Sequence, residues 1–201
     1  MPRVVDHQQR RDELVAVVWQ LIVSDGLPGI TIRRVAERSG WSSGAVRHYL
    51  PNREAILDAA AGRVAEVIEQ RVRAVPPAAQ PPSAQPREAL IAVLEAVLPT
   101  DEVMVLASRV WLAFVGQAAS DKSLADAQGI VYRDLNRLLV ELLQWAEATG
   151  HRVSGGPATA AAQLQALVDG LTVHLLLGQL SADRADEVVR DAVSAVVADH
   201  G

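Results

Sequence analysis

The sequence predicts an all-α protein: a small N-terminal domain with a larger helical body behind it. Apolar residues recur with the helical period in almost every segment, and residues that cap or break helices separate these segments. No segment alternates apolar and polar residues as a half-buried strand does, so we expect no strand and about nine helices. Half of the 201 residues are hydrophobic and 21% are charged, which is enough apolar surface for a core.

The N-terminal domain is predicted to contain three helices, followed by a longer one. The first helix has its apolar stripe at Leu14, Val17, Val18, Leu21 and Ile22, with Gly26 and Pro28 after it. Further helices begin after Thr31, Ser42 and Asn52, whose side-chain oxygens can accept hydrogen bonds from free backbone N–H groups. We expect them to end near residues 38, 48 and 75, with Gly40 breaking the first of them.

A change in composition marks the connection to the body. Residues 75–86 contain five of the ten prolines, which predicts an extended linker; recognition by a proline-binding domain is the alternative. Five apolar-periodic stretches follow, at 87–98, 101–119, 123–149, 157–180 and 182–199. We therefore place a first domain at 1–53 and a second at 54–201, with the fourth helix as connector.

Several classes of protein are disfavoured. Without cysteine there is no disulfide framework, thiolate metal site or cysteine nucleophile. No run reaches the roughly 18 uncharged apolar residues of a membrane span, and residues 1–11 lack the apolar core of a signal peptide. Catalytic motifs such as Gly-x-Ser-x-Gly, a phosphate loop or His-Glu-x-x-His are missing, and the five histidines are scattered. We expect a soluble cytoplasmic protein that is no enzyme and holds no cofactor or metal.

Charge differs between the two parts of the chain. Up to Arg53 there are eight arginines and five acidic residues, a net charge of +3, whereas the remainder has eleven basic and nineteen acidic residues, a net charge of −8. A basic N-terminal domain on an acidic body suggests a polyanionic partner for the former. Chance is the alternative for so small an excess.

Residues 31–50 carry the strongest functional pattern. Two short helices flank a turn at Gly40, Ala36 is small where they must cross, and Val35, Trp41, Val46 and Tyr49 can point inward. This is the pattern of a helix-turn-helix, whose second helix lies in the major groove of DNA. Its outward residues are small or hydrogen-bonding, and a glycine near the helix start lets the backbone approach another surface. An ordinary helical hairpin is the alternative.

The stretch from Ile30 to Leu57 resembles the N-terminal domain of the TetR family of transcriptional regulators, and the length and the helical remainder agree with it. The body resembles the BetI-like branch more loosely, through Val-Trp-Leu-Ala-Phe at 110–114 and Ala-Leu-Val-Asp-Gly-Leu at 166–171. The sequence departs from the family at three positions. Arg47 replaces a frequent tyrosine, Leu50 a phenylalanine and Arg53 a lysine.

The resemblance implies a set of DNA contacts. Phosphate contacts are implied for Thr31, Arg33 and Arg53, base contacts for Ser43, Gly44 and Ala45, and a base or backbone contact for His48. Ser42 joins this set, and Arg47 meets either phosphate or a guanine. Two alternatives stay open: Thr31 and Ser42 act only as caps, and Arg33 or Arg34 belongs to a solvated face.

The resemblance also implies that the body binds a small effector. The apolar faces of two predicted helices are expected to belong mainly to the core. They consist of Met104, Ala107, Trp111, Phe114 and Ala118 on one stretch, and of Leu124, Val131, Leu135, Leu138, Leu142 and Trp145 on the next. Because aromatic residues are scarce, the pocket candidates are Trp111, Phe114, Tyr132 and Trp145. Arg109 and Gln117 are weaker candidates.

A polar stripe on the next-to-last helix lies opposite His174. It contains Gln165, Asp169, Thr172 and Gln179, and we expect Asp169 to be a solvated or interface carboxylate rather than a cation ligand. His174 itself is expected to be buried or at an interface, with a role as pocket donor as the alternative.

The last two helices are apolar on most of their circumference, which predicts that a second copy covers them. Such a dimer presents two DNA-binding domains to the two halves of a palindromic operator. The leading hypothesis is therefore a homodimeric regulator, a repressor that a small molecule releases from duplex DNA. A helical protein-interaction module without a small-molecule ligand is the alternative, and a helical enzyme with an unrecognised site is a third reading.

Overall fold

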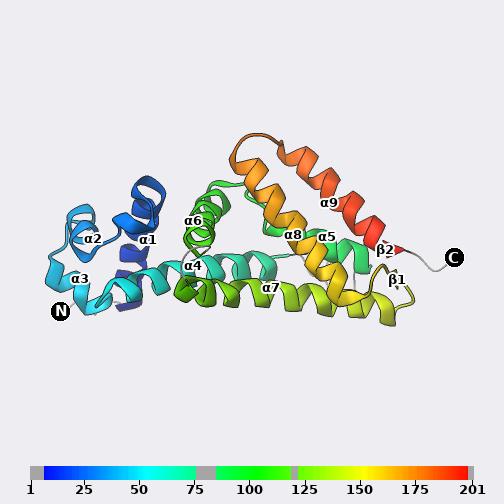
Figure 1. The fold of residues 1–201 in the computed structure, drawn as a ribbon, viewed down its shortest axis with the longest axis horizontal. Coiled ribbons are helices and arrows are strands. Elements are labelled where there is room, and N and C mark those ends of the chain that lie inside the picture. The colour runs from blue at the N-terminus through cyan, green and yellow to red at the C-terminus, as the bar shows by residue number, and fades with distance from the viewer. Residues whose placement is uncertain (1–6, 76–84, 119–121, 199–201) are drawn as a thin grey trace, which may run out of the picture. The chain divides into compact units, whose positions relative to one another are not determined.

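The computed structural model describes residues 7–75, 85–118 and 122–198 (Figure 1). These ranges contain nine α-helices, a 3₁₀ turn and two strands of two residues each. In chain order the elements are α1 (His7–Asp25), η1 (Leu27–Gly29), α2 (Ile32–Ser39), α3 (Ser43–Tyr49), α4 (Arg53–Arg73), α5 (Pro86–Ala96), α6 (Glu102–Ala118), α7 (Lys122–Ala148), β1 (Arg152–Val153), α8 (Pro157–Leu176), α9 (Ala182–Val196) and β2 (Val197–Ala198).

The predicted all-α class is confirmed, and local chemistry explains where the helices begin. The side chains of Thr31, Ser42 and Asn52 accept hydrogen bonds from the backbone N–H groups of residues 34, 45 and 55, at 3.2, 3.1 and 2.8 Å. Gly40 ends α2 with a φ of 74°, the left-handed conformation that glycine adopts at little cost. These helix ends depend on residues a few positions apart in sequence.

The expectation of no strand is wrong at one place. Strands β1 and β2 pair antiparallel, with Arg152 opposite Ala198 and Val153 opposite Val197. The chain between α7 and α8 returns beside the end of α9, and its backbone groups need partners there. The N–H of Ser154 donates to the carbonyl oxygen of Val196 at 2.8 Å, which extends the pairing.

The chain forms two compact units, and the division does not follow the predicted boundary at residue 53. The first unit comprises residues 1–66 and 106–128, and the second comprises residues 67–105 and 129–201. The boundary thus passes through helices α4, α6 and α7. Linker residues 76–84 and the side chains of Leu124 and Val131 lie outside the described residues.

The first unit contains the helix-turn-helix and the first turns of α4 (Figure 1). Helix α2 contacts both α1 and α3. Each of these helices turns fully buried residues inward: Leu14, Val18, Ile22, Val35, Val46, Ile56 and Ala60. We call α1, α2, α3 and residues 53–66 the head.

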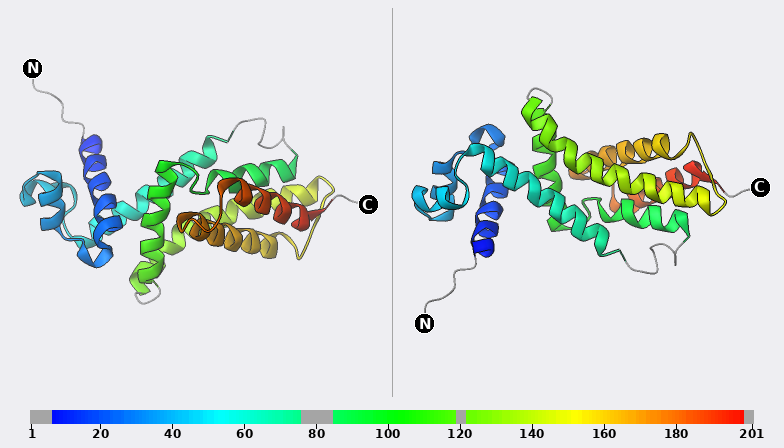
Figure 2. Two further views of the ribbon diagram at one scale, coloured as in Figure 1. Left: turned by 90° about the horizontal axis from the view of Figure 1, so that it is seen from above. Right: turned by 90° about the horizontal axis from the view of Figure 1, so that it is seen from below.

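The second unit is built around an aliphatic core that α5, α8, α9 and the second half of α7 share. Both views in Figure 2 show these helices side by side, with α9 against α5 and α8. The fully or almost fully buried side chains include Leu90, Leu94, Leu139, Leu143, Leu164, Val168, Val189 and Val193. We call this unit the body. Among the described residues, no helix is long and apolar enough to cross a membrane.

Candidate nucleic-acid interface

Helix α3 separates its side chains cleanly into two faces. Val46 is fully buried and Leu50, which caps the C-terminus, is 1% exposed, whereas Ser43, Gly44, Arg47 and His48 are exposed and Ala45 is half-buried. Arg47 makes no hydrogen bond or ion pair with any described residue. The outward face of α3 therefore carries small and hydrogen-bonding groups with a guanidinium free to meet a ligand.

The angle between α2 and α3 is set by packing beneath that face. Val35 is fully buried and Ala36 is nearly so. The side chain of Ala36 is a single methyl group, which lets the two helices approach closely. The half-buried rings of Trp41 and Tyr49 meet edge to face, with centroids 5.6 Å apart. These are the positions predicted to point inward, and they hold the outward face of α3 in a fixed orientation.

The end of α3 is also attached to the start of α1 through aromatic contacts. The ring of His48 lies 5.0 Å from that of Tyr49 and 5.4 Å from that of His7, measured between centroids. The guanidinium of Arg10 lies 5.5 Å from the ring centre of Trp41, within cation–π range. Exposed His48 is therefore restrained on one side and accessible on the other.

Thr31 and Ser42 both act as helix caps, and the alternative that they act only as caps stays open. Each hydroxyl oxygen accepts a backbone hydrogen bond, at 3.2 Å from Arg34 N and 3.1 Å from Ala45 N. A hydroxyl that accepts in this way still has its own hydrogen to donate. Both side chains are exposed, so capping and donation to a phosphate oxygen are compatible.

The arginines predicted to contact phosphate differ in their surroundings. Arg33 pairs with Glu37 at 2.8 Å, and its side chain is 86% exposed. Arg53 is exposed at the first residue of α4, and its guanidinium donates to the carbonyl oxygen of Leu27 at 3.0 Å. Arg53 thus ties α4 to the 3₁₀ turn before α2, a structural role that the sequence did not reveal.

Two further contacts position the helices of the head. The indole N–H of buried Trp19 donates to the carbonyl oxygen of Ala60 at 3.0 Å, joining α1 to α4. At the end of α1, Asp25 is ion-paired with Arg34 of α2. The pKa of Asp25 is lowered below its ordinary value, and the hydrogen bond from Arg34 is the largest cause.

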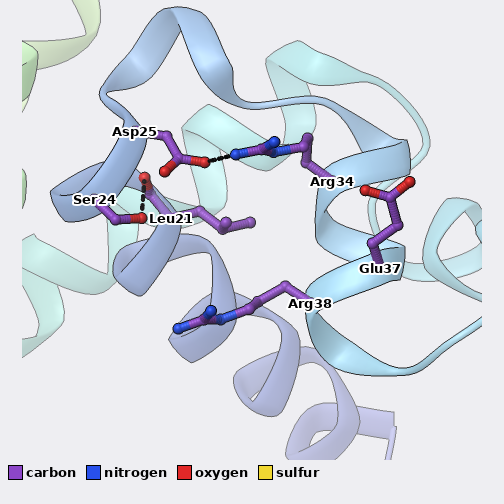
Figure 3. Close-up of a pocket in the computed structure, with 6 residues that line it drawn as sticks. All are labelled: Leu21, Ser24, Asp25, Arg34, Glu37 and Arg38. Atoms are coloured by element: carbon purple, nitrogen blue, oxygen red, sulfur yellow. Dashed lines mark hydrogen bonds and ion pairs between the residues drawn. The ribbon is translucent and has the colours of Figure 1, made fainter.

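This ion pair lies in a surface recess of about 270 Å³ between α1 and α2 (Figure 3). The recess is lined by Leu21, Ser24, Asp25, Arg34, Glu37 and Arg38. Two carboxylates balance two guanidiniums, and Figure 3 shows Arg34 directed at Asp25. The arrangement is typical of a charged joint between two helices.

The residues predicted to line an effector pocket are distributed over both units. In the first unit Trp111 is half-buried and Phe114 is 1% exposed. In the second, Tyr132 is 49% exposed and Trp145 packs against the body core. His174 is exposed on α8, so it is not buried within the chain, and its predicted place at an interface stays a prediction.

Two residues of the predicted polar stripe, Gln165 and Thr172, are buried against the protein, whereas Gln179 is exposed. Gln165 is 2% exposed, accepts a hydrogen bond from Asn136 at 2.9 Å and donates to the carbonyl oxygen of Tyr132 at 3.1 Å. Thr172 is buried as well. Because α7 supplies hydrogen-bonding partners, a buried glutamine costs little here.

Asp169 lies one turn beyond Gln165 in the same row, and it is half-buried rather than solvated. Burial alone raises the pKa of its carboxyl to about 6. It makes no hydrogen bond or ion pair with the described residues. Gln165 and Asp169 belong to the stripe predicted from the sequence, whereas their neighbour Asn136 on α7 was not predicted. Gln165 and Asp169 directly follow the apolar residues Leu164 and Val168, and this spacing could have indicated that they lie at the edge of the buried face.

Comparison with known proteins shows which family the chain resembles. Residues 86–198 match the family model for the C-terminal domain of BetI-type transcriptional repressors. The chain is 28% identical over 199 residues to the HTH-type transcriptional regulator PksA of Bacillus subtilis (strain 168), covering 98% of this chain and 94% of that protein. It is 29% identical over 205 residues to the HTH-type transcriptional regulator BetI of Burkholderia ambifaria (strain MC40-6), covering 98% and 99%.

The fold is shared with a transcriptional regulator from Saccharomonospora viridis that was solved in complex with choline. The TM-score is 0.81 at 22% identity, over 95% of this chain and 99% of the other. The family match covers more than half of the chain, and the relatives align along nearly all of it, head included. The chain therefore belongs to the TetR family of transcriptional regulators, in the branch whose C-terminal domain is of the BetI type.

Proposed function

We propose that this regulator is a repressor that binds a palindromic operator as a homodimer and leaves it when a small-molecule effector binds the body. The observation that carries the proposal is the outward face of α3, where Ser43, Gly44, Arg47 and His48 are exposed above a buried Val46. In a helix-turn-helix this face enters the major groove. The absence of a side chain at Gly44 permits a close approach to the bases.

Base and phosphate contacts divide between the helices of the head. Ser43, Gly44, Ala45 and His48 are proposed to approach base edges from α3. Thr31, Arg33 and Arg53 are proposed to bind phosphate from the first turns of α2 and α4, and Ser42 from the cap of α3. Arg47 is assigned to phosphate, because it has no hydrogen bond or ion pair with the described residues and replaces a residue that serves this purpose in the family.

Selection of duplexes from random DNA by the purified protein tests the proposal. We expect enrichment of a palindrome with two related half-sites. The double variant Arg47→Ala, His48→Ala should enrich no such sequence, whereas Arg63→Ala, which removes an exposed head arginine paired with Glu66, should select the same duplexes. Selection of no sequence by the unmodified protein would exclude the proposed function.

The proposed dimer uses the outer face of α8. Ala162, Ala166, Gly170, His174 and Leu177 are all exposed on one side of this helix, and the side chain of Leu177 is 65% exposed. Small residues allow the backbones of two helices to approach, and a large exposed leucine next to them favours coverage by an apolar surface. His174 is therefore reassigned from the effector to the interface between copies.

Gly170→Glu tests this interface without removing part of the core. A Cβ atom at Gly170 meets nothing within 4 Å, so a monomer tolerates the glutamate, whereas two apposed α8 helices do not. The matched control is Gly62→Glu, at another exposed helical glycine with open space around it. We expect sedimentation to show a folded monomer for Gly170→Glu and a dimer for the control. Dimers of both variants would contradict the assignment.

The proposed effector carries a positive charge. A half-buried carboxylate whose pKa is raised by burial gains from a nearby cation, and Asp169 has none among its described partners. Choline, the ligand of the Saccharomonospora viridis relative, is such a cation. Tyr132 and Trp145, which lie in the same unit as Asp169, are proposed to contact the apolar part of the effector.

Titration with choline and with 3,3-dimethylbutanol, its uncharged analogue, tests the charge of the effector. We expect choline to raise the melting temperature and release the selected duplex, and Asp169→Asn to abolish both effects. Gln163→Glu, an exposed substitution on the same helix, is the control. Equal responses to the charged and uncharged compounds would contradict a cationic effector.

A further inference from the structure

The first turn of α1 contacts the end of α3 through three aromatic rings, all within the head. The ring centroid of His7 lies 5.3 Å from that of Tyr49 and 5.4 Å from that of His48. The rings of His48 and Tyr49 meet edge to face at 88°, with centroids 5.0 Å apart. The imidazole of His7 thus lies against two consecutive side chains of α3.

This cluster is anchored on the side of Tyr49. Tyr49 is half-buried, and its ring also contacts that of Trp41, which precedes α3. Arg10 lies three residues after His7 on α1, with its guanidinium 5.5 Å from the ring centre of Trp41. Glu13 pairs with Arg10 at 3.1 Å. Because residues three apart share one side of a helix, the same face of α1 contacts the chain on both sides of α3.

His48 is the exposed member of the cluster. It forms no hydrogen bond or ion pair with a described residue, so ring contacts are the specific interactions that restrain its imidazole. Tyr49 is its neighbour on α3, and His7 supplies the contact from another helix. An exposed side chain without such contacts would populate several rotamers.

The orientation of an imidazole determines which base edge it can read. A neutral imidazole has a hydrogen-bond donor at one ring nitrogen and an acceptor at the other. In the major groove each base pair presents its own pattern of donors and acceptors. A histidine held in one orientation therefore prefers one base pair, whereas a histidine that rotates freely discriminates less.

We propose that His7 is a positioning residue for operator recognition. It holds the imidazole of His48 in the orientation that selects one base pair in each half-site. The inference rests on the proposed function, in which His48 approaches base edges from α3. Because His7 acts through His48, its loss should reduce the preference at one position more than the affinity for DNA as a whole.

Substitutions separate the ring of His7 from its nitrogen atoms. His7→Ala removes the ring, and His7→Phe keeps an aromatic ring without a hydrogen-bonding group. His48→Ala removes the side chain that is proposed to read the base. The matched control is Gln20→Ala, at an exposed polar residue of α1 that forms no hydrogen bond or ion pair with a described residue.

The primary measurement is affinity for the selected duplex and for duplexes with each position of one half-site substituted. An aromatic pair contributes a factor of about 2 to 13 to an equilibrium constant, so His7→Ala should reduce the preference at the position that His48 reads by about that factor. His7→Phe should keep most of the preference, and Gln20→Ala all of it. In a His48→Ala background, His7→Ala should cause no further loss. All variants should melt within a few degrees of the unmodified protein.

Three results would overturn the positioning role. They are an equal loss of affinity for all duplexes in His7→Ala, a further loss of preference in the His48→Ala background, and a loss in His7→Phe as large as that in His7→Ala. Each would leave the proposed function standing if the unmodified protein selects a palindrome. Selection of no duplex by the unmodified protein would exclude the proposed function itself.

A second measurement tests the restraint on His48 without DNA. In protein labelled with ¹³C at the histidine rings, the signals of His48 are those that disappear in His48→Ala. The ring currents of His7 and Tyr49 should displace these signals from those of a free imidazole. His7→Ala should move them towards the free values and sharpen them, whereas His7→Phe and Gln20→Ala should leave them displaced. Unchanged signals of His48 in His7→Ala would overturn the positioning role, whatever the DNA measurements show.

Discussion

Helices α3 and α8 both carry polar residues on one side, and the two helices turn these residues in opposite directions. In α3 the polar residues Ser43, Arg47 and His48 face solvent, and the apolar side is buried. In α8 the polar residues Gln165 and Thr172 are buried, and a row of small residues faces outward. A polar face of a helix is therefore exposed unless a neighbouring helix offers hydrogen-bonding partners to its side chains. In α8 the neighbouring helix α7 supplies hydrogen-bonding partners for buried Gln165.

The same contrast appears in two carboxylates. Asp25 in the head is paired with Arg34, which lowers its pKa, whereas burial raises the pKa of Asp169 in the body. Asp25 is therefore compensated by a cation, whereas the described surroundings of Asp169 do not compensate its charge. This difference predicts opposite responses of the two carboxylates to pH.

The largest expected effect on stability comes from the body core. Leu143 is fully buried, and Leu143→Ala should lower the free energy of unfolding by about 2–5 kcal/mol through lost burial and a cavity. Urea unfolding measures this loss. Val103→Ala, at an exposed valine, should change it by less than about 0.5 kcal/mol. If the two variants were equally stable, the assignment of the body core would be wrong.

Arg47→Ala and Arg53→Ala compare two arginines of the head. Arg47 has no hydrogen bond to a described residue, and Arg53 donates to the Leu27 carbonyl. Arg53→Ala should cost about 1 kcal/mol of stability because its bond to the Leu27 carbonyl is lost, whereas Arg47→Ala should cost almost none. If both bind phosphate, each should weaken all duplexes alike and reduce the salt slope of log K by about one per contact.

Loss of preference at one position per half-site, at about 1–3 kcal/mol, would instead assign Arg47 to a guanine. Binding to the operator and to base-substituted duplexes at two salt concentrations decides between these outcomes. Unaltered affinity for both variants would contradict the placement of α3 in the groove.

The dependence of stability on pH should distinguish Asp169 from Asp25. The raised pKa of Asp169 means that the folded protein favours its protonated form, so the penalty is complete above about pH 6 and vanishes below about pH 4. After allowance for solvent screening, Asp169→Asn should add about 1 kcal/mol of stability at pH 7.5 and nothing at pH 4. The lowered pKa of Asp25 has the opposite sign: its stabilising contribution is present at neutral pH and is lost as the pH falls below 4.

Thermal melting of Asp169→Asn and Asp25→Asn at both pH values checks the two signs. Asp25→Asn should be destabilising at pH 7.5 and progressively less so in acid. A stability gain for Asp169→Asn that does not depend on pH would show that the gain does not arise from titration of Asp169.

The smallest expected effect on stability comes from Arg33. Its pair with Glu37 is highly exposed, so Arg33→Ala should change the free energy of unfolding by less than about 0.5 kcal/mol. Binding to every duplex should nevertheless weaken, because a proposed phosphate contact is lost. Melting and DNA titration of the same preparation make the comparison. Unchanged DNA affinity would assign Arg33 to a solvated face.

Most helix positions could be predicted from sequence because their signals are local. The caps at Thr31, Ser42 and Asn52 and the break at Gly40 depend on side chains within three residues of the backbone groups that they serve. The short strands at Val153 and Val197 could not be predicted in this way. Their pairing joins residues 44 positions apart and depends on where α9 ends beside the loop.

Periodicity and short-range capping are sufficient to predict the all-helical class, the helix-turn-helix and the polar outward face of α3. The burial of Gln165, the exposure of His174 and the bond of Arg53 to a residue 26 positions away emerge only when the helices pack. The period of a helix identifies its faces. Which face is buried depends on the partners that the folded chain brings to it.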